Sequence, residues 1–364
     1  MMLKLSDRNW KEFNAFGTDG LFEIHTTNSS IDKNKLLSGD TLTVPYVTRS
    51  GGSNGVSKFV SSENYRYGFD NGKSITVGLD TQTAFYQPYK FVTGQNIQVV
   101  TGEHLTPSVI LFLLPLFRSQ MTAKFNWGGN GATLSRMKRL KLLLPVNAMD
   151  QPDYAFMSDY VDQQKKQLQS KYVIYAQKKL QMLGTPKPLK TLSELNWGYV
   201  HINDIATVKS GKDIYAHERV SGDLPYVTSG TSNNGIGYFV GNDNKSKADH
   251  VISVNRNGAV GEAFYHPYTA LFGNDCRTLV LNEQYEYAPF FIAAMLRKQK
   301  DAFSYSRKLG TARLKVLRIM LPVESDGKPD YDYMEQYVKN KMIQKYDHYL
   351  KYLNASQCIC DRQQ

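Results

Sequence analysis

The sequence carries two ordered copies of the same short motifs, and this duplication limits the fold more than any other feature. Each copy contains Leu-Pro-Val followed by Pro-Asp-Tyr-x-x-Met-x-x-Tyr-Val, at 144–161 and at 321–338. Upstream, Pro-Tyr-Val-Thr at 45–48 returns at 225–228. The offset between the copies changes only from 180 to 177 residues along the chain. A period this long excludes a solenoid and indicates a duplicated domain.

A long helix is predicted to begin at each Pro-Asp-Tyr motif. Proline lacks an N–H and aspartate suits the positive end of the helix dipole, so both are typical of a helix start. In the first copy, large side chains recur every seven residues and predict one buried stripe, namely Tyr154, Val161, Leu168, Tyr175 and Met182. The second copy is expected to supply the facing stripe from Met342, Tyr346, Tyr349, Leu350 and Leu353.

The rest of each copy is predicted to be mixed and mostly β. Short β-rich runs alternate with Gly, Asn and Ser clusters that mark turns, at 42–48, 74–79, 96–100, 224–228, 250–255 and 278–281. An apolar helix near 107–121 or 288–300 and a basic loop follow in each copy. We therefore divide the chain into a first domain at 1–149, a spacer helix at 150–184, a second domain at 185–326 and a second helix with its tail at 327–364.

Charge and composition point to a polyanionic partner. The net charge is +11, from 44 basic and 33 acidic residues, which favours nucleic acid over an inert basic surface. No signal-type run opens the chain, and the longest apolar block, 109–117, is too short to span a bilayer. We expect a cytoplasmic protein with no membrane partner. Three cysteines without further ligands are expected to be reduced thiols rather than a disulfide or a metal site.

Catalytic motifs are scarce. The sequence has no Asn/Asp-Pro-Pro-aromatic tetrapeptide and no Gly-rich turn that opens a helix after a strand. Pro152-Asp153 and Pro329-Asp330 resemble part of a nuclease motif, but helix capping explains them better. The histidines have no ligand spacing, so no metal site is predicted. These observations favour binding over catalysis.

The duplicated motifs resemble those of one known family. They are Pro225-Tyr226-Val227-Thr228 with Asn233-Asn234-Gly235, the turn Asn255-Arg256-Asn257-Gly258, Phe264-Tyr265-x-Pro267, and Leu-Pro-Val leading twice into Pro-Asp-Tyr-x-x-Met. Their order resembles the specificity subunit of type I restriction-modification systems, and the similar DNA-recognition subunit of type IIB systems. In the first copy, Val77-Gly78-Leu79-Asp80 stands where we align Arg256-Asn257-Gly258-Ala259, so we expect the first copy to lack this turn.

The resemblance implies an α+β architecture with two tandem, mostly-β target-recognition domains. Each is followed by a long helix, and the two helices pair as an antiparallel coiled coil with pseudo-two-fold symmetry. Such a subunit is not an enzyme. It reads a bipartite sequence in double-stranded DNA for partner methyltransferase subunits, with or without a nuclease or translocase subunit. S-adenosylmethionine is then bound by the partner, and this chain holds no cofactor.

Two other classes of function remain open at this stage. One is a standalone DNA methyltransferase whose active site is not recognisable in the sequence. The other is a tandem-repeat module that binds proteins rather than DNA through its tyrosine-rich loops. Methyl transfer by the purified chain would identify the first, and a lack of salt-dependent DNA binding would identify the second.

Two turn-rich loops in each copy supply the candidate DNA-binding residues. Short polar side chains suit base edges and phosphates, while aromatic and basic side chains stack on bases and neutralise phosphates. The first-copy candidates are Arg49, Ser50, Ser53, Asn54, Lys58, Asn126, Trp127, Arg136 and Lys138. The second-copy candidates are Ser229, Thr231, Asn233, Asn234, Asn255, Arg256, Asn257, Tyr305, Arg307, Lys308, Arg313 and Lys315.

Each of these candidates has a structural alternative. The polar loops are also typical of solvated hairpin turns, and Trp127 and Tyr305 are also compatible with core positions. Arg256 is the favoured base-reading residue, because arginine bound to guanine is the commonest specific contact. Tyrosines along the two helices exceed what one helix pair needs, so Tyr172, Tyr175, Tyr346 and Tyr349 are predicted to bind the partner subunit.

Overall fold

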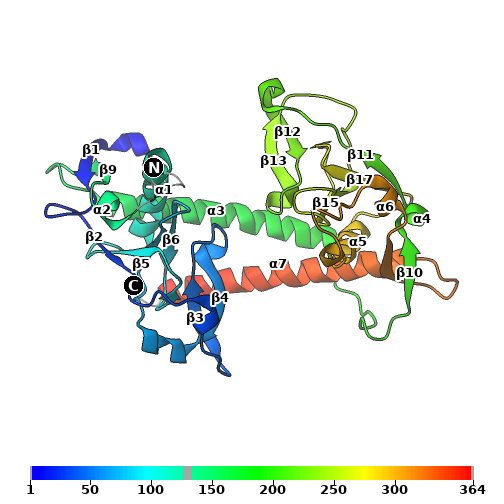
Figure 1. Ribbon diagram of the computed structural model, residues 1–364, viewed down its shortest axis with the longest axis horizontal. Helices are drawn as coiled ribbons and strands as arrows, with labels where there is room; N and C mark the ends of the chain where they lie inside the picture. The colour runs from blue at the N-terminus through cyan, green and yellow to red at the C-terminus, as the bar shows by residue number, and fades with distance from the viewer. Residues whose placement is uncertain (1, 126–130, 132, 362–364) are drawn as a thin grey trace. The chain divides into compact units, whose positions relative to one another are not determined.

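The computed structural model describes residues 2–125, 131 and 133–361, with side chains described as far as residue 355. Two compact units divide the chain, Met1–Tyr172 and Val173–Gln364, so the first long helix contributes to both. Each unit is described by itself. Figure 1 gives the labels of the helices and strands.

Unit 1 contains two β-sheets and one additional strand pair. The four-stranded sheet has the order β2-β8-β5-β6, the three-stranded sheet has the order β4-β3-β7, and β1 pairs with β9. The strands are β1 (Asn9–Asn14), β2 (Glu23–Thr26), β3 (Leu42–Val47), β4 (Val56–Ser61), β5 (Ser74–Gly78), β6 (Thr83–Gln87), β7 (Val92–Thr93), β8 (Ile97–Thr101) and β9 (Lys141–Val146). The α-helices are α1 (Pro107–Lys124), α2 (Leu134–Met137) and α3 (Tyr154–Leu183).

Unit 2 repeats this plan element by element. Its sheets have the orders β11-β17-β14-β15 and β13-β12-β16, and β10 pairs with β18. The strands are β10 (Trp197–His201), β11 (Ala206–Ser210), β12 (Ser221–Val227), β13 (Ile236–Val240), β14 (Val251–Asn255), β15 (Ala263–His266), β16 (Leu271–Phe272), β17 (Cys276–Leu281) and β18 (Arg318–Pro322). The α-helices are α4 (Ile202–Ile205), α5 (Ala288–Arg297), α6 (Thr311–Lys315) and α7 (Tyr331–Asp361).

Short 3-10 turns complete both units. In unit 1 they are η1 (Leu5–Asp7), η2 (Lys33–Lys35), η3 (Ser53–Gly55) and η4 (Ser62–Tyr67), and in unit 2 they are η5 (Ala216–Glu218), η6 (Asn233–Gly235) and η7 (Lys300–Ala302). The predicted duplication of a mostly-β domain is confirmed by the matching sheet orders. The predicted strands and apolar helices lie within a few residues of the observed elements.

The repeated Leu-Pro-Val and Pro-Asp-Tyr motifs form the junction between each domain and its helix. The backbone N–H of Asp153 donates to Pro145 O at 2.9 Å, and that of Asp330 donates to Pro322 O at 2.9 Å. Each aspartate also caps its helix, since Asp153 accepts from the amide of Phe156 at 2.9 Å and Asp330 from that of Tyr333 at 2.8 Å. The prediction of helix capping is therefore confirmed.

Each unit has its own hydrophobic core between sheet and helix. In unit 1, α1 places Leu113, Phe117 and Met121 against Ile75 and Val77 of the four-stranded sheet. In unit 2, α5 lies between β15 and α7, as Figure 1 also shows. No helix among the described residues is long and apolar enough to cross a membrane.

The predicted buried stripe of α3 is wrong beyond its first two turns. The side chains of Leu168, Tyr175 and Met182 are 70%, 49% and 61% exposed. The buried residues of this half are Ala176 and Leu183, each one residue further along and therefore about 100° around the helix. We call Leu168, Tyr175 and Met182 the exposed stripe.

Within unit 2, the end of α3 runs antiparallel to α7. Lys187 N donates to Asn340 Oδ1 at 3.0 Å, and the rings of Tyr175 and Tyr346 lie 6.1 Å apart. Residue numbers therefore increase along α3 in the direction in which they decrease along α7. Leu183 also shares the core of unit 2 with residues of α7. Pairing of the two complete helices as a coiled coil remains a prediction.

Candidate nucleic-acid interface

The loop that follows the central strand of each three-stranded sheet has the same backbone in both units. Thr48 N donates to Gly55 O at 2.8 Å, and Thr228 N donates to Gly235 O at 2.7 Å. Six residues lie between these ends in each unit, 49–54 and 229–234. Their sequences differ, Arg-Ser-Gly-Gly-Ser-Asn against Ser-Gly-Thr-Ser-Asn-Asn. One backbone therefore presents two sets of side chains.

Asn54 and Asn234 have a role in this shared backbone. Their φ angles are +57° and +53°, in the left-handed region that asparagine tolerates better than most residues. The Asn54 amide also donates to Tyr86 O of the neighbouring β6. Turn formation therefore accounts for the repeated Asn-Gly in both copies without a contact to DNA.

The turn that joins β5 to β6 in unit 1, and β14 to β15 in unit 2, lies beside this loop. Leu79 N donates to Asn96 O at 3.1 Å in unit 1, and Arg256 N donates to Asp275 O at 2.7 Å in unit 2. These bonds make Leu79 equivalent to Arg256 and Asn96 equivalent to Asp275. The expectation that the first copy lacks the turn is wrong.

A difference in turn length explains the misalignment of the two copies. Six residues separate the paired Val77 and Ala84, whereas eight separate the paired Val254 and Ala263. The matched Ala-Phe-Tyr motifs lie beyond the turn, so an alignment that continues back from them is shifted by two positions.

Each unit has one arginine–aspartate ion pair at the meeting point of this loop and this turn. In unit 1, Arg49 of the loop pairs with Asp80 of the turn. In unit 2, Arg256 of the turn pairs with Asp275 at 3.1 Å. We define the loop corner by four positions in each unit, 49, 79, 80 and 96 in unit 1 and 229, 256, 257 and 275 in unit 2.

The predicted role of Asn255 in DNA binding is wrong. Its side chain is fully buried, because it lies in the central strand β14 with its amide hydrogen-bonded to Gly230 O at 3.1 Å. This bond ties the turn to the loop and positions Arg256 next to it. Asn255 therefore stabilises the loop corner from a buried position in the sheet.

The second predicted loop supplies exposed basic and aromatic side chains. Tyr305 is 74% exposed, and Lys308 lies over its ring at 4.6 Å, so Tyr305 is not a core residue. Asn126 and Trp127 lie outside the described residues. In unit 1 this loop approaches the loop corner, because a Cβ on Gly131 would lie 3.3 Å from Leu79 O.

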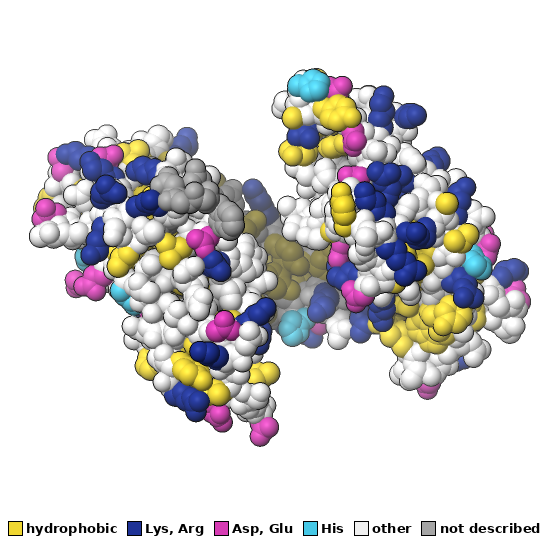
Figure 2. Space-filling view, in the orientation of Figure 1, with side chains coloured by type: hydrophobic (Ala, Val, Ile, Leu, Met, Phe, Trp, Pro, Cys, Tyr) yellow, Lys and Arg dark blue, Asp and Glu magenta, His cyan; other side chains and the backbone are white. Residues whose placement is uncertain are grey.

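The remaining candidates lie largely on the surface. Those with exposed side chains are Arg49, Ser50, Ser53, Lys58, Lys138, Thr231, Asn233, Arg307, Arg313 and Lys315. Those with half-buried side chains are Arg136, Ser229, Arg256, Asn257 and Lys308. Figure 2 shows dark blue lysine and arginine side chains gathered over the middle of unit 2.

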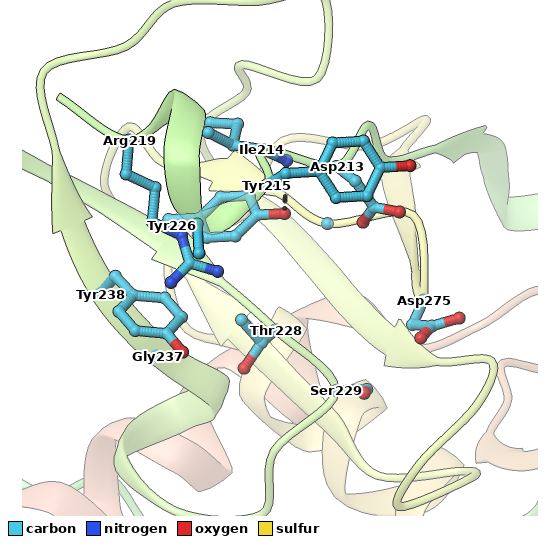
Figure 3. Close-up of a pocket in the computed structure, with 12 residues that line it drawn as sticks. Asp213, Ile214, Tyr215, Arg219, Tyr226, Thr228, Ser229, Gly237, Tyr238 and Asp275 are labelled. Atoms are coloured by element: carbon cyan, nitrogen blue, oxygen red, sulfur yellow. Dashed lines mark hydrogen bonds between the residues drawn. The ribbon is translucent and has the colours of Figure 1, made fainter.

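A polar pocket of about 380 Å³ adjoins the loop corner of unit 2. Ser229 and Asp275 belong to both, and the rest of the lining includes Tyr215, Tyr226 and Tyr238 (Figure 3). The guanidinium of Arg219 stacks on Tyr238 at 3.6 Å from the ring centre. Arg219 thus already covers the ring of Tyr238, and the pocket leaves open space beside Asp275.

The helix tyrosines predicted to bind a partner differ in their surroundings. Tyr346 packs partly buried against the core of unit 2, and its hydroxyl lies 3.4 Å from that of Tyr175. Tyr172 is half-buried, whereas Tyr349 is exposed and its ring lies 6.0 Å from that of Tyr352. Tyr175 and Tyr346 thus contact each other where the two helices meet.

Sequence reasoning missed both aspartates of the loop corners and Arg219. Asp275 lies 19 residues after Arg256, and only the pairing of β14 with β17 brings the two together. Asp80 lies in the turn after β5, but its partner Arg49 lies in the loop after β3, which belongs to another sheet. An aspartate alone does not predict contact with DNA, which is itself negatively charged, unless the arginine that pairs with it is known.

Comparison with known proteins identifies the family of this chain. The family described as type I restriction modification DNA specificity domain matches residues 9–171 and 194–347. A known relative, the type II restriction enzyme BgcI specificity subunit S.BcgI of Heyndrickxia coagulans, is 28% identical over 341 residues, which cover 92% of this chain and 97% of the relative.

Two solved structures are similar to this chain over nearly its whole length. The S subunit of a type I system from M. genitalium has a TM-score of 0.49 and 18% identity, with 100% of this chain and 97% of that one covered. The HsdS subunit from Thermoanaerobacter tengcongensis has a TM-score of 0.30 and 13% identity, with 94% and 93% covered. The family match extends over both units, and the chain therefore belongs to the type I restriction modification DNA specificity domain family, with one such domain in each unit.

Proposed function

We propose that this specificity subunit reads a bipartite, asymmetric sequence in double-stranded DNA, with one half-site for each unit. The observation that carries the proposal is the loop corner. The backbone hydrogen bonds that frame it are the same in both units, although the turn is two residues longer in unit 2. All four of its side chains differ, Arg49, Leu79, Asp80 and Asn96 against Ser229, Arg256, Asn257 and Asp275. A shared framework with different side chains is what two different half-sites require.

Catalysis is assigned to partner subunits. Among the described residues, no group of three or more His, Cys, Asp or Glu side chains could hold a metal ion. The Ser253–His266 pair is fully buried in the sheet and has no access to a substrate. We expect the methyltransferase partner to bind S-adenosylmethionine and to modify the DNA that this chain selects.

A binding selection on randomised duplex DNA tests this function. The full chain, assembled with its methyltransferase partner, should enrich two fixed blocks of sequence separated by an unconstrained spacer. Enrichment of a single continuous block, or of no sequence at all, would contradict the proposal. Methyl transfer by the purified chain without a partner would contradict the division of labour.

Phosphate contacts are expected from the exposed lysines of the basic loops. Lys138→Ala and Lys315→Ala should weaken binding to all sequences alike and reduce the salt slope, d log K/d log[salt], by about one. Sequence preference should not change, because a phosphate carries no base identity. Titrations of each variant over a range of salt concentrations measure the slope. A change in base preference would show that these lysines contact bases instead.

Partner docking is proposed on the long helices rather than on the loops. The exposed stripe presents apolar surface on α3, and the exposed Tyr349 and Tyr352 do so on α7. Aromatic side chains and methionine are enriched in protein interfaces, and a few buried side chains, tyrosine among them, supply most of the binding energy. Tyr346 is reassigned to the contact between α3 and α7, because it packs on the core of unit 2.

A further inference from the structure

Both loop corners contain an arginine–aspartate pair, although the pair is built from different positions. Unit 1 takes its arginine from position 49 and its aspartate from position 80. The equivalent positions in unit 2 hold Ser229 and Asn257, and the pair there uses Arg256 and Asp275 instead. Simple retention after duplication would have kept the same residues at the same positions.

Stability does not account for this recurrence. Both side chains of each pair are partly exposed, with 43% and 31% for Arg49 and Asp80, and 29% and 44% for Arg256 and Asp275. Ion pairs in such places contribute only about 0–1 kcal/mol to folding. A function of the exposed pair itself is the better explanation.

The pair matches one base-pair edge in the major groove. Guanine presents two acceptors, N7 and O6, and its paired cytosine presents the N4 amine next to them. A guanidinium with a carboxylate at its side offers donors followed by an acceptor, which is the complementary order. An adenine would place its N6 amine against the guanidinium, and a thymine would place its O4 against the carboxylate. Both contacts are repulsive.

Each carboxylate retains an oxygen for such a contact. Asp275 accepts a hydrogen bond from Arg256 through Oδ1, and no described residue donates a hydrogen bond to its Oδ2. Asp275 also borders the pocket of unit 2, which leaves room beside it (Figure 3). Asp80 accepts hydrogen bonds from Arg49 and Asn96 through Oδ2. No described residue donates a hydrogen bond to its Oδ1.

We propose, building on the proposed function, that each arginine–aspartate pair reads one G·C base pair. The arginine donates to N7 and O6 of guanine, and the aspartate accepts from N4 of the paired cytosine. Asp80 and Asp275 are therefore specificity residues, and each half-site contains one G·C pair read by this device.

The test compares base preferences of variants of the full chain in its complex. Arg256→Ala and Asp275→Asn should each reduce the preference for G·C about tenfold or more at the same position of one half-site. Arg49→Ala and Asp80→Asn should do so at one position of the other half-site. Asparagine is the matched replacement for Asp275, because unit 1 has Asn96 at the equivalent position. Thermal unfolding of each variant verifies its fold.

A cytosine analogue separates base reading from mere support of the arginine. 2-Pyrimidinone lacks the N4 amine of cytosine. Wild-type protein should lose about tenfold in affinity when this base replaces the cytosine, whereas Asp275→Asn should lose little more, since the contact is already absent. An equal loss in both proteins would overturn the role of Asp275 in reading cytosine.

Rebuilding the unit 1 pair in unit 2 provides a rescue. The combined variant Ser229→Arg, Arg256→Leu, Asn257→Asp and Asp275→Asn gives unit 2 the four corner residues of unit 1. It should recover the preference for G·C that Arg256→Ala loses. Uniform weakening by the single variants, or no recovery here, would overturn the proposal while leaving bipartite recognition intact. A wild-type complex without any sequence preference would instead refute the proposed function itself.

Discussion

Charge substitutions in the exposed stripe of α3 should prevent assembly with the methyltransferase partner. We expect Leu168→Glu combined with Met182→Glu to weaken the complex about 30-fold or more. A carboxylate buried in an apolar contact loses its hydration, and a loss of about 1 kcal/mol or more at each of the two positions gives this factor. Pull-down and titration with the purified partner measure the loss.

Folding of the variant chain should be nearly unchanged, because both side chains are more than half exposed. Tyr199→Glu is the matched control, since Tyr199 is 70% exposed on β10, outside the two long helices. It should leave assembly intact. Unchanged assembly of the double variant would place the partner elsewhere on the chain.

Acid should destabilise unit 2 through the buried His266. Its ring forms two hydrogen bonds, from Nε2 with Ser253 Oγ at 2.8 Å and from Nδ1 with Tyr268 Oη at 3.2 Å. The side chain is fully buried. Burial lowers the pKa of His266 to about 4 from an ordinary value of 6.5. The unfolded chain therefore binds more protons than the folded chain between these two values of pH.

Stability should consequently fall as pH falls through this window. Above pH 6.5 the ring is neutral in both the folded and the unfolded chain. By about pH 4 the protonation of His266 in the unfolded chain should lower the free energy of unfolding of unit 2 by about 3 kcal/mol. Urea unfolding at several pH values measures the effect.

His266→Gln is the matched variant. Unit 1 has Gln87 at the equivalent position, bonded to Thr76 Oγ1 at 3.0 Å. The variant should lose less stability than wild type between neutral pH and pH 4, whereas replacement of the exposed His217 by Gln should not alter the profile. Parallel profiles for wild type and His266→Gln would contradict the assignment.

The architecture of the chain was largely predictable from its repeats. Motifs such as Leu-Pro-Val and Pro-Asp-Tyr mark the junction between domain and helix, where hydrogen bonding and capping depend on local sequence. Their duplication predicted two equivalent domains. The alternation of turn residues with β-rich runs was enough to locate most strands, because those signals are also local.

The buried face of α3 could not be predicted in the same way. Leu168, Tyr175 and Met182 carry a strong hydrophobic signal at heptad spacing, yet the buried residues of this half are Ala176 and Leu183, each one residue later. A small residue such as Ala176 contributes little to a hydrophobic pattern even where it is buried. The stronger pattern belongs to the exposed stripe.

The loop corners were predictable only in part. Arg49 and Arg256 were recognised from residue type and turn context, but their aspartate partners depend on contacts across strands and sheets. Asn54 and Asn234 were assigned to DNA from composition, whereas their positive φ angles give them a backbone role. Residue type alone does not separate a turn-forming asparagine from a base-reading one.

Exchange of the loop between the two units tests the central claim, that each unit reads its own half-site. Residues 229–234 are replaced by the sequence of residues 49–54, which has the same length and the same flanking hydrogen bonds. The wild-type and exchanged chains, each in complex with the methyltransferase partner, are then compared in the same selection on randomised DNA.

Base preference should change in one half-site, the other half-site should be read as before, and the spacer between them should keep its length. Distant, independent sites behave additively, so the unaltered unit has no reason to respond. Equal changes in both half-sites, or an unchanged sequence in both, would contradict the account.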